Sequence, residues 1–344
     1  MIDEALLLKF LVDLLKTPSP TGYTEEATAL VERAFKAIPG VKTSRTRKGA
    51  LVATLEGQRQ NAPRALAAHV DTLGAMVKNI KPSGRLSLSK IGGFAWNTVE
   101  GEGCTVFTRS GRRVRGSVLV TAASSHVYGA KTAELKRDDD TMEVRLDEKA
   151  ASVEEVKSLG IDVGDYIAFD PRVELTNGFV RSRHLDDKAA VACLVEALRA
   201  LRSEGLKPAQ TTYFFISNFE EVGHGAANGL PAEAGELVVV DMAAVGDGQN
   251  SDEFHATLCV KDSSGPYHHG LSNHLRKLAD NHGIPYKVDI YPYYGSDGSA
   301  FWRAGGEAAV ALIGPGVDAS HNYERTHTDA LTATANWILA YLLD

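Results

Sequence analysis

The hydrophobic pattern of this 344-residue chain changes twice along its length. From the N-terminus to about residue 72, and again from about residue 176 to the end, amphipathic helical patterns alternate with short apolar runs, which is typical of an α/β domain. Residues 73–175 instead contain short strand-like runs separated by Gly, Asp and Lys, a pattern that indicates a small all-β module or barrel. We therefore expect one α/β domain, residues 1–72 and 176–344, interrupted by a β-rich domain at residues 73–175.

The composition of the chain indicates which kinds of molecule the protein binds and where it is located. The formal net charge is −7, which argues against nonspecific binding to nucleic acid. The chain has no apolar run of about 18 residues and no basic segment before its first helix, so we expect neither a membrane span nor a signal peptide. Its three cysteines are far apart and odd in number, which favours a reducing compartment. These features predict a cytoplasmic protein without nucleic-acid or membrane partners.

Polar side chains gather where the predicted elements of the α/β domain begin or end. Each has an ordinary explanation when it is taken alone: a histidine can be a satisfied core residue, an aspartate can cap a helix, and a pair of glutamates can lie in a solvated loop. The motifs are His69 and Asp71 in "AAHVDTLG", Asp186 and Asp187 in "RHLDDK", Glu220 and Glu221 in "NFEEVGHG", Asp241 in "VVVDM", and His321 and His327 in "GPGVDASHNYERTH".

Taken together, these residues favour a metal site. In open α/β sheets, binding sites form at the carboxyl ends of the strands. Two histidines with three or four carboxylates suit Zn²⁺, Co²⁺ or Mn²⁺, and one carboxylate can bridge two ions about 3.5–4 Å apart. Of two adjacent glutamates, one can then bind metal while the other accepts a proton from water.

The motifs resemble those of the tetrahedral (TET) or glutamyl aminopeptidases, metallopeptidase family forty-two, some of whose members were once labelled endoglucanases. The resemblance covers nearly the whole chain, and "NFEEVGHGAA" is its most specific piece. "AAHVDTLG" is similar to the family's His-x-Asp motif, and "LDDKAA" is similar to its Asp-Asp-Arg/Lys helix start. "GSDGSAFWRAGG" is similar to its Gly-x-Asp segment before the last strand.

The resemblance implies a zinc-peptidase-like three-layer α/β catalytic domain with an inserted small β-barrel domain that serves oligomerisation and substrate access. It implies an aminopeptidase that acts on peptides and forms homo-oligomers, dodecamers in particular. Two divalent ions per subunit are implied, Zn²⁺ or Co²⁺, with Mn²⁺ as a further possibility. The implied roles are Asp186 as the bridging ligand, His69 and Asp241 as ligands of one ion, Glu221 and a C-terminal histidine as ligands of the other, Glu220 as the general base, and Asp71 as the partner that orients His69.

The C-terminal motif departs from the family pattern, Arg-Tyr-x-His-Ser, because it contains two histidines. We prefer His321 as the ligand, since it lies six residues after Pro315 and leaves about ten residues before the final helix. His327 leaves fewer, and we expect it beside the ligands or in the substrate pocket.

Two other interpretations remain at this stage. "GPGVDASH" is similar to the end of related deacylases, so the chain could be a deacylase or dipeptidase that acts on small N-acyl amino acids or dipeptides. The β-rich insert argues against this, because deacylases generally carry an α/β domain there. A catalytically inactive scaffold is the third interpretation, although every expected acid is present.

Overall fold

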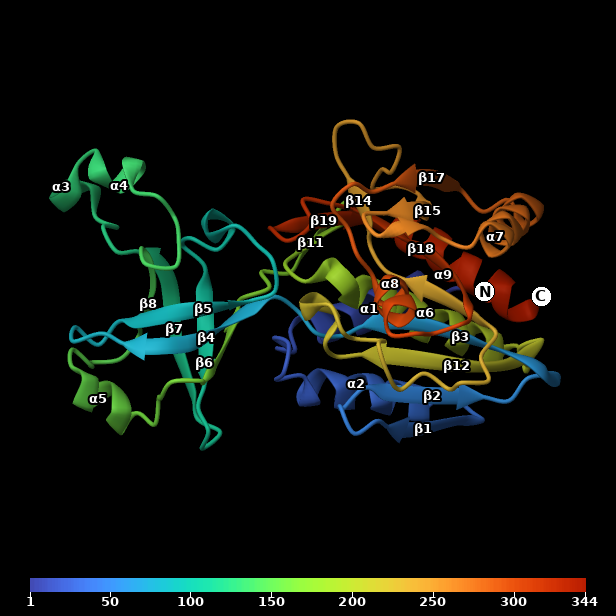
Figure 1. Cartoon of the computed structure of the whole chain (residues 1–344), viewed down its shortest axis with the longest axis horizontal. Helices are drawn as coiled ribbons and strands as arrows, with labels where there is room; N and C mark the ends of the chain where they lie inside the picture. The colour runs from blue at the N-terminus through green and yellow to red at the C-terminus, as the bar shows by residue number, and fades with distance from the viewer. The chain divides into compact units, whose positions relative to one another are not determined.

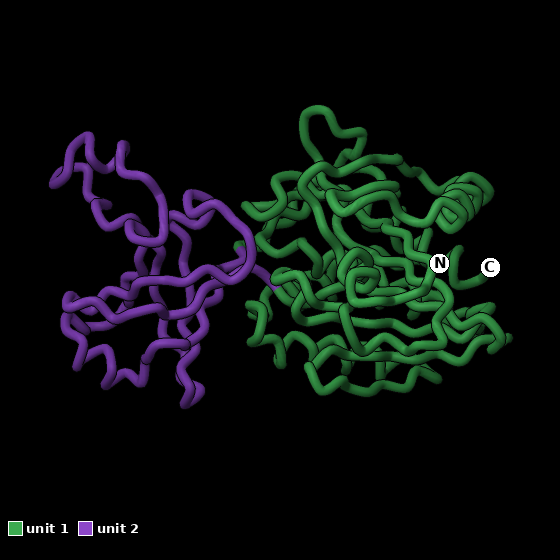
Figure 2. The backbone as a smooth tube through the Cα atoms, in the orientation of Figure 1, with its two compact units in different colours: residues 1–71, 172–344 green, residues 72–171 purple.

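The computed structural model describes residues 1–344, and the chain divides into two compact units. Residues 1–71 and 172–344 form the first unit, and residues 72–171 form the second (Figure 2). Residues 172–176 lie outside the insertion because strand β10 (Glu174–Thr176) pairs with β11 (Phe179–Ser182) in the sheet of the first unit. The inserted segment therefore ends slightly earlier than the position expected from the sequence.

The first unit, here called the α/β unit, is built on one 13-stranded sheet. Its strand order is β1-β2-β12-β3-β13-β18-β19-β11-β10. In addition, β14 and β15 pair with β18, and β16 and β17 pair with β15. The strands not yet given are β1 (Val41–Arg45), β2 (Leu51–Leu55), β3 (Arg59–His69), β12 (Gln210–Ser217), β13 (Glu236–Val240), β14 (Ala243–Val245), β15 (Ala256–Asp262), β16 (Gly265–Pro266), β17 (Tyr286–Ile290), β18 (Ala309–Asp318) and β19 (Glu324–His327).

The centre of this sheet is parallel. Strands β12, β3, β13 and β18 run in the same direction, each paired with the next. Their side chains alternate between two buried faces: in β13, Leu237 and Val239 join one apolar cluster while Val238 and Val240 join the other. Strands that are buried on both faces read as continuous apolar runs, which is why such runs in the sequence indicated an α/β domain.

Helices cover both faces of the sheet (Figure 1). Helices α1 (Glu4–Leu15), α2 (Glu25–Lys36), α6 (Leu185–Ser203), α7 (His269–His282) and α9 (Thr328–Leu343) contribute to the larger apolar cluster. Helix α8 (Asp297–Arg303) packs against β13 and β18 and contributes to the cluster on the other face. The predicted three-layer α/β arrangement is therefore confirmed.

The second unit contains a closed antiparallel barrel of strand order β4-β5-β8-β7-β6-β9 around its own apolar core. Its strands are β4 (Gly74–Ile80), β5 (Leu86–Ile91), β6 (Gly103–Phe107), β7 (Arg113–Val120), β8 (Met142–Leu146) and β9 (Tyr166–Phe169). Its helices are α3 (Ser125–Tyr128), α4 (Lys131–Glu134) and α5 (Val153–Ser158), together with a short turn at Trp96–Thr98. The expected small β-barrel is confirmed. No helix of either unit has the length and apolar character needed to cross a membrane.

Candidate metal centre

The sequence-predicted residues come together at the carboxyl ends of the four parallel strands. His69 is the last residue of β3, and Asp241 follows β13 directly. Glu220 and Glu221 lie in a short 3₁₀ turn that begins three residues after β12. His321 lies in the loop between β18 and β19. The sheet thus brings residues that are up to 252 positions apart in the chain (His69 and His321) to one edge.

Two aspartates join this edge from the start of α6. Asp186 and Asp187 have non-helical backbone angles, so the regular helix begins after them, and the peptide bond between them is cis. Both side chains are buried. In the sequence, Asp187 was one of the polar residues that together favour a metal site, without a role of its own; the structure places its carboxylate among the candidate ligands.

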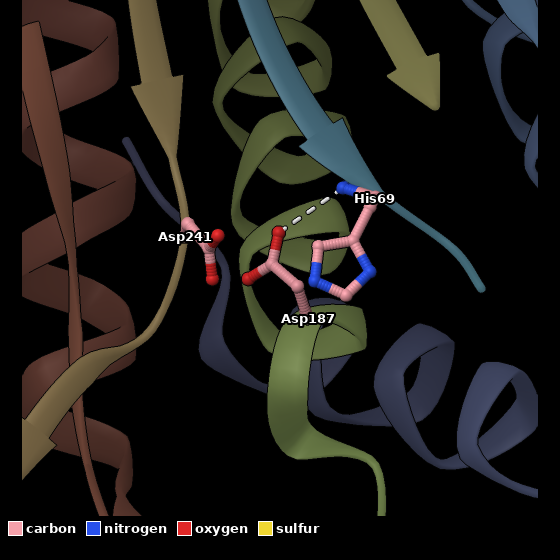
Figure 3. A group of neighbouring side chains, drawn as sticks. All are labelled: His69, Asp187 and Asp241. Carbon is pink, nitrogen blue, oxygen red and sulfur yellow. Dashed lines mark hydrogen bonds between the residues drawn. The ribbon is translucent and has the colours of Figure 1, made fainter. Parts of the chain in front are cut away.

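The side chains form two groups, each with ligand atoms within 4.8 Å of one another. The first contains His69, Asp187 and Asp241, whose side chains point toward one another (Figure 3). The second contains Asp186, Glu221 and His321.

Asp186 lies between the two imidazoles. One of its oxygens is 3.0 Å from Nε2 of His69, and the other is 3.3 Å from Nε2 of His321. Nε2 of His321 is also 3.6 Å from Oε2 of Glu221. The carboxylate of Asp186 therefore contacts the histidine of each group.

Asp71 contacts His69 mainly through its backbone oxygen, and not through its carboxylate as we expected from the sequence. Nδ1 of His69 lies 2.9 Å from the backbone oxygen of Asp71 but 3.6 Å from its carboxylate. The carboxylate instead accepts hydrogen bonds from the backbone N–H groups of Glu220 and Glu221, at 3.1 and 3.2 Å. It also accepts one from the hydroxyl of Thr21 at 2.7 Å. Asp71 thus orients the imidazole through its main chain and fixes the Glu-Glu turn through its side chain.

His327 is outside both groups. Its side chain caps α9, and its ring contacts Phe179 and Phe254, with centroids 4.9 and 5.2 Å apart. The final helix begins at Thr328, earlier than the sequence analysis assumed, because the His327 side chain accepts a hydrogen bond from the Asp329 N–H. The spacing argument for His321 was therefore inaccurate, although the geometry places that histidine with Asp186 and Glu221.

Two further buried acids support the site, and the sequence analysis did not single them out. Glu324 accepts hydrogen bonds from the backbone N–H groups of Asp186 and His321, both at 3.1 Å. Asp297, at the start of α8, accepts one at 2.7 Å from the N–H of Ala226, in the loop that follows Glu220 and Glu221. Both acids lie within segments quoted above, Asp297 in "GSDGSAFWRAGG" and Glu324 in "GPGVDASHNYERTH", but the sequence alone indicated no separate role for either of them.

Burial shapes the ionisation of these acids. Desolvation and the Asp241 carboxylate raise the pKa of Asp187, and desolvation and the Asp186 carboxylate raise the pKa of Asp241 to about 7. Desolvation raises the pKa values of Glu220 and Glu221, and it raises the pKa of Glu324 to about 8.

The pKa values of Asp186 and His69 are instead governed by oppositely charged neighbours. Desolvation opposes the charge on Asp186, but contacts with His321 and His69 hold its pKa below the usual range. Burial likewise opposes the charge on His69, yet Asp186 and Asp71 raise its pKa. Four carboxylates, Asp186, Asp187, Glu221 and Asp241, lie in the two groups, each beside one imidazole. A divalent cation bound in each group would compensate for this buried negative charge.

Comparison with known proteins decides the family. The profile of the M42 glutamyl aminopeptidase family matches residues 49–337. The chain belongs to the M42 family. It is 48% identical over 336 residues to "Putative aminopeptidase YhfE" of Bacillus subtilis (strain 168), covering 97% of this chain and 96% of that protein.

Solved structures share the fold of this M42 chain. A TET aminopeptidase from the marine sediment archaeon Thaumarchaeota archaeon SCGC AB-539-E09 superposes with a TM-score of 0.87 at 18% identity, over 98% of this chain and 95% of that one. The TET1 peptidase of Pyrococcus horikoshii superposes with a TM-score of 0.85 at 22% identity, over 98% and 99%.

Membership in the M42 family makes the chain an aminopeptidase, a hydrolase of a metal-dependent family. The two groups described above are its candidate metal positions.

Proposed function

We propose that this M42 aminopeptidase removes N-terminal residues from peptides at a centre of two divalent metal ions. In this proposal Asp186 would serve both ions. His69 and Asp241 would hold one ion, with Asp187 beside them, and Glu221 and His321 would hold the other. The observation that carries the proposal is the position of Asp186, whose two oxygens lie 3.0 and 3.3 Å from the imidazoles of the two groups.

The donor set fits such ions. Carboxylate oxygens and imidazole nitrogens are suitable ligands for Zn²⁺, Co²⁺ and Mn²⁺. Oδ1 of Asp187 is buried and has no hydrogen-bond partner, although a buried polar atom normally has one. A cation in the first group would provide that partner.

Glu220 is the group we assign as the general base. It belongs to neither ligand group, and its Oε2 lies 3.8 Å from Nε2 of His69. The Glu220 N–H donates to the Asp71 carboxylate, which holds the main chain of the turn in place beside the first group. Desolvation raises the pKa of Glu220, which strengthens it as a proton acceptor.

The reaction that follows is hydrolysis of the first peptide bond. The bound ions would supply Lewis acidity toward the scissile carbonyl and toward the attacking water. Glu220 takes a proton from that water as its oxygen bonds to the carbonyl carbon. Glu220 then delivers the proton to the leaving amine as the C–N bond breaks.

Homo-oligomerisation is a second part of the proposal. The TET1 peptidase of Pyrococcus horikoshii is described as assembling into a tetrahedron or a large octahedral shell. We propose that this chain also forms a homo-oligomer, of twelve subunits in the tetrahedral case, and that the inserted barrel unit contributes to its contacts.

A substrate panel tests the activity. Metal-free protein, and protein restored with Zn²⁺, Co²⁺ or Mn²⁺, is assayed on aminoacyl p-nitroanilides, on short peptides and on N-acyl amino acids. We expect metal-dependent release of free N-terminal residues and no cleavage of the N-acyl substrates. Cleavage of N-acyl amino acids alone would establish the deacylase alternative instead.

A further inference from the structure

Glu324 is a buried acid that joins two separate segments of the α/β unit. It is the first residue of β19 and is 2% exposed, and the residues of β19 alternate between buried and partly exposed positions. A buried carboxylate costs free energy unless charged or hydrogen-bonded groups compensate for it. The compensation here comes from two backbone N–H groups, those of Asp186 and His321, each at 3.1 Å.

The sheet register explains how one side chain reaches both segments. Glu324 lies opposite Ser182 at the end of β11, and β11 leads directly into the residues that precede Asp186. Oε2 of Glu324 therefore accepts from the Asp186 N–H, while Oε1 accepts from the His321 N–H in the loop before β19.

The loop at His321 needs such support. His321 has a φ of 62°, and Ala319 has a φ of 57°, so two non-glycine residues of this loop are in the left-handed region. This region is unfavourable for residues with a Cβ atom. The hydrogen bond to Glu324 fixes the His321 backbone in this conformation, which directs the imidazole toward Asp186 and Glu221.

We propose that Glu324 is a positioning residue for the second candidate metal position. Each of its two carboxylate oxygens holds the main chain of one ligand of that position, Asp186 or His321. The first position depends less on Glu324, because it shares only Asp186 with the second position, whereas His321 belongs to the second position alone. The inference rests on the proposed function, since it requires the two metal positions.

Glu324→Gln provides the test. The substitution replaces one accepting carboxylate oxygen with an NH₂ group, which cannot accept a hydrogen bond from the backbone N–H that faces it. Metal-free protein is titrated with Co²⁺, with bound metal measured by equilibrium dialysis and elemental analysis. We expect the wild type to bind two ions. In the variant we expect one affinity to be retained and the other to fall about 10- to 100-fold.

Matched variants identify which position is affected. The Co²⁺-binding curve of Glu324→Gln should resemble that of His321→Ala and differ from that of His69→Ala. Glu253→Gln is the control. Glu253 belongs to neither ligand group, and its carboxylate oxygens accept hydrogen bonds at 2.6 and 2.8 Å from the guanidinium of Arg325, which follows Glu324 in β19. Thermal unfolding of each metal-free variant reports general damage to the fold. If Glu324→Gln does not fold, Glu324→Asp replaces it, because the shorter side chain cannot reach both N–H donors.

Three results would overturn the inference in distinguishable ways. If Glu324→Gln binds two ions with wild-type affinities, Glu324 does not position the site, and the proposed function is unaffected. If both affinities fall equally and the metal-free variant is less stable than the Glu253→Gln control, the role of Glu324 is structural. If the wild type binds fewer than two ions, the proposed two-ion function fails and the inference fails with it.

Discussion

Adjacent residues in this site have different surroundings. Glu220 and Glu221 are neighbours in one turn, yet Oε2 of Glu221 lies 3.6 Å from His321 and Oε2 of Glu220 lies 3.8 Å from His69. Gly223 follows them with a φ of 83°, a left-handed conformation that suits glycine and ends the turn. The turn thus directs two chemically identical side chains to the two groups, which is the basis for assigning them different roles.

Glu220→Gln tests the role of the general base. The amide keeps the shape of the side chain but cannot accept a proton, so we expect kcat to fall by about 10²- to 10⁴-fold. Metal content should not change, because Glu220 is in neither ligand group. Steady-state kinetics and elemental analysis on the same preparation measure both quantities. Near-wild-type kcat would remove Glu220 from this role.

The ion pairs of Glu32, which lies outside the candidate metal centre, predict how the stability of the fold depends on pH. Its carboxylate contacts Lys36 at 2.7 Å and Arg45 at 2.8 Å, and these partners lower its pKa from 4.5 to about 2. Because the folded-state pKa lies below the unfolded value, the stabilisation is complete above about pH 4.5 and is lost as the pH falls toward about 2.

The Glu32→Gln variant should therefore unfold more easily near neutral pH, by about 1 kcal/mol for this partly exposed cluster. The difference from the wild type should shrink as the pH is lowered below about 4.5. Chemical denaturation at a series of pH values measures it. A difference that stays constant down to acidic pH would show that the ion pairs are not its source.

At the scale of elements, the pairing of β13 with β18 positions Asp241. A Cβ added at Gly314 of β18 would lie 1.7 Å from the backbone oxygen of Asp241, so no side chain fits there without moving the main chain. We expect Gly314→Ala to lower the free energy of unfolding by about 1–3 kcal/mol and to weaken metal binding at the group that contains Asp241.

Gly246→Ala is the matched control for this prediction. A Cβ at Gly246 meets no atom within 4 Å, and this glycine follows β14 in a loop. Thermal unfolding and metal titration should leave this variant close to the wild type. Equal effects of the two substitutions would mean that loss of glycine, and not the contact with Asp241, is responsible.

The elements also show what the sequence could predict. The central strands and long helices were predictable because continuous apolar runs and helical periods record burial directly. The short elements α3, α4, α8 and β14 to β17 were not identified, since they have two to seven residues and leave little periodicity. The contacts of Glu324 were not predictable either, because they depend on the register between β11 and β19.

At the scale of the whole molecule, the proposed assembly should depend on the barrel unit. Helices α3 and α4 have no buried residue, and within α3 Val127 and Tyr128 are 72% and 43% exposed. Exposed apolar side chains that lie together often mark protein contacts. We therefore expect these two residues to contact a second copy of the chain.

A double variant, Val127→Asp with Tyr128→Asp, should reduce the mass of the assembly as measured by light scattering after size-exclusion chromatography. Val163→Asp is the control, because Val163 is a separate apolar residue of the same unit, 62% exposed. An unchanged mass for the double variant, or an equal loss for the control, would place the contact elsewhere.

The proposed function requires two metal ions that act with Glu220 on a free N-terminal residue. The most direct measurement is a titration of metal-free protein with Co²⁺, in which bound ions and release of p-nitroaniline from an aminoacyl p-nitroanilide are followed together. We expect saturation at two ions per chain, activity only in the presence of metal, and the same two ions without turnover in Glu220→Gln. Full activity in the metal-free protein, or saturation of binding and activity at one ion, would contradict the proposed function.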